Sequence, residues 1–251
     1  MRYKKEKNYW QQDIHKRDYL AIILQGLALT LLLSYVFYDS LWGVIPLSPI
    51  FFVFFRIRKA SIIKKKQSDF RLQFKDAIHA ISDALNVGYS VENAIREARK
   101  ELEILYKKEE PVLREFRYMI RQLDMNLTAE SVLLEFAVRT GDEEVWTFAT
   151  VFGVAKRSGG DMIAMIHTAV GRITEQVELL GEMETLIAAK KLEFHIMTAI
   201  PICMLCYMRL SFPGLLQVLY GNIFGIVLMS VCLLVYLLAY LAGRHIVEVE
   251  V

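Results

Sequence analysis

The chain has 251 residues, 55% of them apolar, and a formal net charge of +2. So high an apolar content is unlike an ordinary soluble domain, and the nearly balanced charge excludes the strongly basic surface of a nucleic-acid-binding protein. We therefore expect a membrane protein without a nucleic-acid partner. All three cysteines lie in apolar stretches, which predicts neither a disulfide framework nor a redox pair.

Four apolar stretches predict two transmembrane hairpins. Residues 20–38 carry no charge and are about long enough to cross a bilayer. Residues 41–55 are shorter and contain Pro46 and Pro49, so a kinked or partly re-entrant segment fits them almost as well as a full span. Residues 196–212 and 223–242 form the second pair, joined by a link without charge.

Lysine and arginine indicate how the chain crosses the membrane. They are frequent in residues 1–19 and 56–66 and missing from both interhelical links, which places the termini and the middle segment in the cytoplasm. The basic residues after the second stretch could also contact anionic lipid headgroups. The predicted parts are a cytoplasmic segment at 1–19, a hairpin at 20–55, a cytoplasmic domain at 56–195, a hairpin at 196–243 and a tail at 244–251. The pattern assigns no role to the two terminal parts.

The middle segment is predicted to be a helical bundle, because apolar residues recur every three or four positions through six successive runs. Glycines followed by capping side chains separate several runs. These pairs are Gly88 with Ser90, Gly141 with Asp142, and Gly159–Gly160 with Asp161. Thr128 is also expected to cap the start of a helix, and Pro111 to lie in the first turn of one. The predicted fold is an all-α integral membrane protein, in which two transmembrane helical hairpins flank a cytoplasmic antiparallel bundle of about six helices.

The last bundle helix carries a heptad pattern. Apolar residues repeat every seven positions at Ile166, Ile173, Leu180 and Ile187, which predicts a helix–helix seam. We expect a helix of the same bundle to cover this seam, in preference to a helix of another protein. A continuous helix from residue 161 would extend on the order of 50 Å before the third span. A break near Lys190 fits the sequence equally well.

The stretch VAKRSGGDMIAMI, residues 154–166, does not match a phosphate-binding loop. Such a loop follows a strand and needs G-x-x-x-x-G-K-[ST], whereas here a helical run precedes the glycines and Arg157 lies upstream of them. We interpret the stretch as a hinge, in which Gly159 ends one helix, Gly160 allows close packing and Asp161 caps the next helix. The histidines are scattered, and the acids of the last helix lack a partner base. The sequence therefore predicts no enzyme activity, no cofactor and no metal site.

Residues 74–98, FKDAIHAISDALNVGYSVENAIREA, resemble the opening helix pair of the type II secretion system F domain. Residues 151–201 resemble its closing half, with an R-x-G-G-D-like turn, a long helix and an alanine-rich approach to a membrane span that contains proline. A single copy of the domain with spans on both sides is most similar to the TadB/TadC-like platform proteins of tight-adherence (Flp) pili.

The resemblance implies a platform protein of the bacterial cytoplasmic membrane. It would couple a hexameric secretion ATPase to the extraction of pilin or pseudopilin subunits and to filament assembly, and it would pair with itself or with a sister platform protein. The hinge and partner-contact residues would be Arg157, Gly159, Gly160, Asp161, Gly88 and Gly141. Two alternatives remain: a membrane-anchored sensor or adaptor, which needs a ligand pocket in the bundle, and a small-solute transporter, which needs polar spans. In the predicted spans the sole charge is Arg209.

Overall fold

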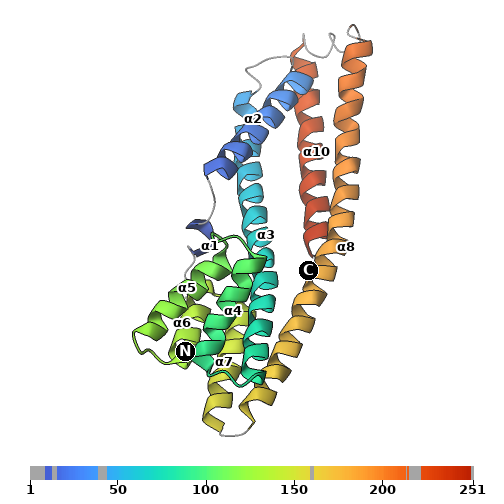
Figure 1. The fold of residues 1–251 in the computed structure, drawn as a ribbon. Coiled ribbons are helices and arrows are strands. Elements are labelled where there is room, and N and C mark those ends of the chain that lie inside the picture. The colour runs from blue at the N-terminus through green and yellow to red at the C-terminus, as the bar shows by residue number, and fades with distance from the viewer. Residues whose placement is uncertain are drawn as a thin grey trace. The chain divides into compact units, whose positions relative to one another are not determined.

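The computed structural model describes residues 9–12, 16–38, 44–158, 161–212, 214 and 222–249 (Figure 1). All regular secondary structure in these ranges is α-helical, which confirms the predicted all-α class. The helices are α1 (Tyr9–Gln12), α2 (Lys16–Tyr38), α3 (Val44–Asn86), α4 (Val91–Leu105), α5 (Pro111–Asp124), α6 (Ala129–Thr140), α7 (Glu143–Ser158), α8 (Met162–Ser211) and α10 (Ile223–Val249).

The chain divides into two compact units. The first, termed the bundle unit, comprises Met1–Ile14 and Ile62–Gly181, and the second, termed the spanning unit, comprises His15–Ser61 and Glu182–Val251. Helices α3 and α8 contribute residues to both units.

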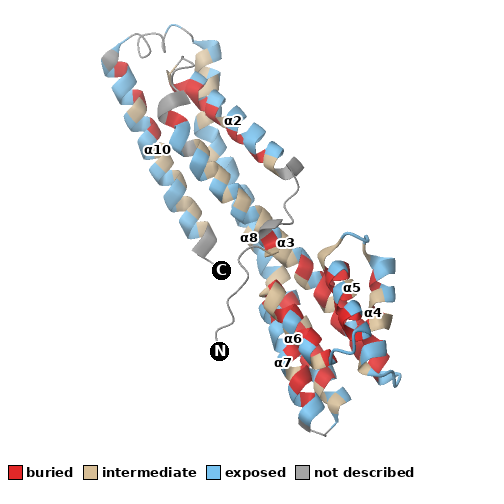
Figure 2. Cartoon of the chain, turned by 90° about the vertical axis from the view of Figure 1, so that its left-hand side faces the viewer, coloured by how far each residue is buried: buried red, intermediate tan, exposed pale blue. Residues whose placement is uncertain are grey.

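The core of the bundle unit is rich in phenylalanine. Phe74 packs against Phe70, Phe136 and Phe148, with ring centroids about 6 Å apart, so that side chains of α3, α6 and α7 meet in one cluster. Buried residues follow the inward faces of α4 to α7 (Figure 2). Burial of these aromatic side chains, together with the aliphatic residues of the same core, stabilises the packing of the helices.

The predicted helix ends of the bundle are confirmed where the structure describes them. The hydroxyl oxygens of Ser90 and Thr128 accept hydrogen bonds from the N–H groups of Asn93 and Ser131, which caps α4 and α6. Pro111 opens α5, where the N–H that proline lacks would have no helical partner. These local signals fix where each helix begins.

Helix α8 is uninterrupted from Met162 to Ser211, so no break occurs near Lys190. Along the predicted seam, Ile166 and Ile173 are buried in the bundle core, whereas Leu180 and Ile187 are half-buried. The first half of the seam is therefore covered within the bundle, as the favoured alternative predicted.

Helix α3 differs from the expectation of a separate second span and first bundle helix, because one helix runs through both. Pro49 lies inside it and removes one backbone hydrogen bond without ending the helix. Within the described residues, three helices are long and apolar enough to cross a membrane, namely α2 over Tyr19–Tyr38, α8, and α10 over Phe224–Val247. Because α3 is not among them, the four-span layout and the side of each terminus stay predictions.

The spanning unit has a small core and an apolar exterior. Leu33, Val36 and Phe37 of α2 pack with Leu47 of α3 and with Met229 and Leu233 of α10. Many leucine and phenylalanine side chains point outward on α2, α8 and α10. A helix that is apolar all round is suited to a lipid environment.

Candidate functional site

Three turns of the bundle unit lie at one end of it. Arg96 in the first half of α4 pairs with Asp124 at the end of α5, at 2.5 Å. Glu130 at the start of α6 pairs with Arg157 near the end of α7, at 3.3 Å. These ion pairs bring the α3–α4, α5–α6 and α7–α8 turns to the same end of the bundle (Figure 1). We define the turn face as residues 87–90, 125–128, 157 and 161.

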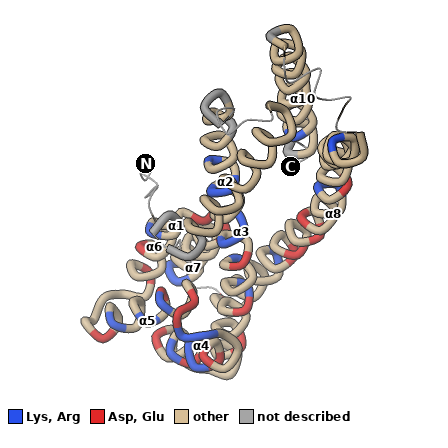
Figure 3. The backbone as a smooth tube through the Cα atoms, turned by 90° about the horizontal axis from the view of Figure 1, so that it is seen from above, with Lys and Arg blue, Asp and Glu red and all other residues tan. Residues whose placement is uncertain are grey.

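The turn face exposes large apolar side chains. Val87 is 77% exposed and Met125 is 72% exposed, and the side chains of Tyr89 and Leu127 are about half exposed. Lys, Arg, Asp and Glu alternate along the bundle helices (Figure 3), and the ion pairs Arg96–Asp124 and Arg157–Glu130 lie close to these turns. Apolar side chains gathered on tight turns and rimmed by charges are typical of a protein-binding surface.

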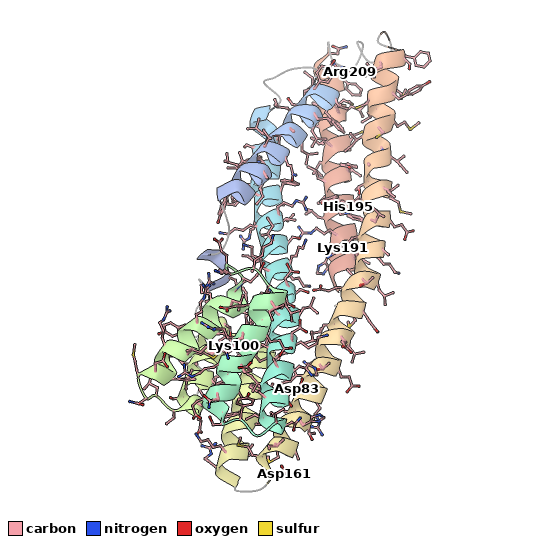
Figure 4. All side chains as sticks on the ribbon, viewed as in Figure 1. Asp83, Lys100, Asp161, Lys191, His195 and Arg209 are labelled. Carbon is pink, nitrogen blue, oxygen red and sulfur yellow. The ribbon has the colours of Figure 1, made fainter. Side chains whose placement is uncertain are left out.

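The predicted hinge residues are partly described. Asp161 lies at this end of the bundle (Figure 4), and its Oδ1 accepts a hydrogen bond from the N–H of Ala164 at 3.1 Å, so the predicted cap of α8 is confirmed. Arg157 is largely exposed and forms the ion pair with Glu130. Gly159 and Gly160 lie outside the described residues.

The two other predicted glycines lie at opposite ends of the bundle. Gly88 belongs to the turn face and has a φ of +98°, whereas Gly141 ends α6 at the other end with a φ of +60°. Both positions are in the left-handed region that favours glycine. Gly141 therefore does not join Arg157 and Asp161 in one site.

A buried acidic pair lies beside Gly141. The Nε of Arg71 on α3 lies 3.0 Å from Oδ2 of Asp142 and 3.3 Å from Oε2 of Glu144. Both carboxyl groups are buried. Burial, followed by the hydrogen bond and negative charge of Asp142, raises the pKa of Glu144 to about 7. The sequence identified Asp142 as a cap but gave no sign of the contact with Arg71, which is 71 residues away.

Helix α1 is part of the bundle core, although the sequence assigned it no role. Trp10 is buried, and its Nε1 donates a hydrogen bond to the carbonyl oxygen of Thr140 at 2.9 Å. The hydroxyl of Tyr9 donates to Oε1 of Glu115 at 2.8 Å, and burial raises the pKa of that tyrosine. Arg139 also binds the Glu115 carboxylate, at 2.8 Å. The sequence did offer one signal for this contact, because two adjacent aromatic residues, Tyr9 and Trp10, stand in an otherwise polar segment.

The acids of α8 do not gather into a site with other ligands. Glu178 pairs with Lys75 of α3 at 3.3 Å. Among the described residues, no group of three histidine, cysteine, aspartate or glutamate side chains is placed to hold a metal ion. The turn face is therefore the candidate functional site that the described geometry favours.

Comparison with known proteins gives no relative. The chain matches no protein-family model, no curated protein and no solved structure. The resemblance to the type II secretion F domain stays a prediction from sequence, and the function is argued from the residues and their geometry.

Proposed function

We propose that this protein is a platform subunit of a type II secretion-like or pilus-like (Tad/Flp) assembly machine in a bacterial cytoplasmic membrane. A hexameric secretion ATPase binds the turn face from the cytoplasm, and pilin or pseudopilin subunits are extracted from the membrane beside the spanning helices. The protein itself hydrolyses nothing. A second copy or a sister platform protein completes the platform.

The observation that carries this proposal is the turn face itself. Its apolar side chains stand on turns whose backbone is held by caps and ion pairs, so little conformational entropy is lost when a partner binds. Helix α3 ends at this face and α8 begins there, and both helices also supply residues of the spanning unit. A partner bound to the turn face thus acts on the two helices that the units share.

The test is co-purification with the secretion ATPase of the same cell in mild detergent. A Val87→Asp/Met125→Asp variant places two charges on the turn face, at its two most exposed apolar side chains. A total loss of about 2 kcal/mol, the size of a single hot spot, would lower capture of the ATPase by roughly 30-fold, and we expect a loss of at least this size.

A matched control uses the other end of the bundle. Ile104 is 85% exposed near the end of α4, and Leu105 beside it is also exposed. An Ile104→Asp/Leu105→Asp variant makes the same change of charge away from the turn face, and we expect it to capture the ATPase as the wild type does.

Each outcome decides the role of the turn face. Capture by the wild type and the control, with loss in the turn-face variant, supports the proposal. Equal capture by both variants refutes the turn face as the contact. If the wild type captures a sister platform protein but no ATPase, the motor contact belongs to the sister and the proposed coupling through this chain fails.

A further inference from the structure

The spanning unit contains an apolar cavity of about 470 Å³. Helices α2, α3, α8 and α10 each contribute to its wall, for example through Leu33, Phe54, Ile202 and Leu237. This volume lies within the roughly 300–1,000 Å³ that is usual for small-molecule sites. The cavity is thus large enough for an organic ligand and not merely a packing defect.

Two polar side chains of the wall, Tyr236 and Thr198, are hydrogen-bonded to backbone carbonyl oxygens. The hydroxyl of Tyr236 donates to the carbonyl oxygen of Thr198 at 2.7 Å, and the hydroxyl of Thr198 donates to the carbonyl oxygen of Phe194. An occupant of this part of the cavity therefore meets mainly hydrocarbon. Burying a polar group there without a partner would cost free energy, so the fitting occupant is apolar.

The two ends of the cavity differ. Leu33, Ile202 and Leu237 belong both to its wall and to the apolar cluster in which α2, α3, α8 and α10 meet, so one end of the cavity borders that cluster. Ile57 of α3 and His195 of α8 are the lining residues of their helices farthest along the chain from that cluster. They mark the opposite end.

Basic residues follow at that opposite end. Three of the lining residues each have a basic residue one helical turn away on the same face. Arg58 follows Phe54, Lys191 precedes His195, and Arg244 follows Tyr240. We define these three as the basic rim.

His195 and Lys191 occupy successive turns of α8 (Figure 4). The Nδ1 of His195 lies 2.5 Å from the carbonyl oxygen of Lys191; because a carbonyl oxygen only accepts, this nitrogen carries the proton. The nearby acid Glu193 lies on another face of α8, where it lines a separate surface hollow with Lys190. On the face of α8 that carries His195, the charged residue one turn away is the basic Lys191.

We propose that this cavity binds one acyl chain of an anionic phospholipid whose phosphate contacts the basic rim. The apolar wall fits the chain, the rim fits the headgroup charge, and three helices of this protein are apolar enough to lie in a bilayer, where such lipids are at hand. The site does not depend on a role in filament assembly.

The test uses the full chain in mild detergent, exposed to equal amounts of phosphatidylglycerol and phosphatidylcholine, with retained lipid counted by native mass spectrometry. The wild type is expected to retain phosphatidylglycerol in preference. Each basic residue near a membrane surface is worth about 1 kcal/mol, or roughly fivefold in affinity, so Lys191→Gln/Arg244→Gln is expected to reduce that preference by roughly 25-fold.

Two further variants separate the chain from the headgroup. Ala199→Phe places a ring in the cavity and is expected to abolish retention of both lipids. Lys190→Gln removes a charge from the other face of α8 and is expected to behave as the wild type.

Several results would overturn the proposal. Equal retention of the two lipids by the wild type, or unchanged retention by Ala199→Phe, would identify the lipid as part of a general layer around the helices. A lipid-free dimer would assign the cavity to a second copy of the chain. If Ala199→Phe does not fold, the rim variant decides, because it leaves the cavity intact. The lipid experiment contains no ATPase, so its failure would not bear on the proposed function, and a failed co-purification would not bear on the lipid site.

Discussion

Replacing Trp10 by alanine tests whether α1 stabilises the bundle unit. Trp10 is 6% exposed, its ring centroid lies 5.1 Å from that of Phe70, and its Nε1 donates to Thr140. Truncation of a buried tryptophan costs about 3–5 kcal/mol, and about 1 kcal/mol shifts the Tm of a chain of this size by roughly 2–4 °C. We therefore expect the Tm of the full chain in detergent to fall by roughly 6–20 °C.

Two further variants make this prediction specific. Trp146 is 39% exposed on α7, so Trp146→Ala removes the same side chain from a surface position and is expected to lower the Tm by less than half as much. Trp10→Phe keeps most of the buried ring but loses the N–H donor, and should cost about 1–3 kcal/mol for the unpaired carbonyl and the lost volume. If Trp10→Ala lowers the Tm no more than Trp146→Ala, α1 is not part of the core and the reasoning is wrong.

Three further predictions concern the buried acid and the helix ends. The pKa of Glu144, about 7 in the folded chain against an ordinary 4.5, means that the folded state binds more protons between these values. Stability to urea should therefore fall as pH rises through that window, by no more than about 3 kcal/mol, and Glu144→Gln should remove this component. Asp161→Ala should cost about 0.5–2 kcal/mol in the same assay, and an unchanged midpoint would contradict its role as a cap. Gly141→Ala should cost roughly 1–2 kcal/mol because of its positive φ. Gly171→Ala, inside α8 and without near neighbours, should be neutral or stabilising.

The sequence predicted the helix boundaries well because their signals are local. Ser90, Thr128 and Asp161 each cap a helix through an N–H three residues away, and Pro111 fits an N-terminal turn through its own ring. The short runs of turn residues between these helices are also the signal from which an antiparallel order is predicted. Signals of this kind need only a few consecutive residues, so they can be read without knowing the fold.

Contacts between distant residues were not predictable in the same way. Nothing near Trp10 or Arg71 in the sequence indicates Thr140 or Asp142 as partners, because those pairs form only when the bundle closes. The exposure of Val87 and Met125 likewise depends on which helices cover them. At Pro49 a local signal was instead misleading. Proline usually breaks a helix, but here it lies inside a long one, where it removes one hydrogen bond and the neighbouring turns continue.

The position of α1 also has a consequence for the order in which the protein forms. Tyr9 is synthesised 106 residues before Glu115, and Trp10 is synthesised 130 residues before Thr140. At about 5–20 residues per second, Trp10 waits roughly 6–26 s for its partner to be made. Early in that interval α2, the next helix in the chain, is completed and becomes free to enter a bilayer. Docking of α1 is thus a late step of biogenesis, and a fragment restricted to residues 62–181 would be made without the segment that covers Phe70.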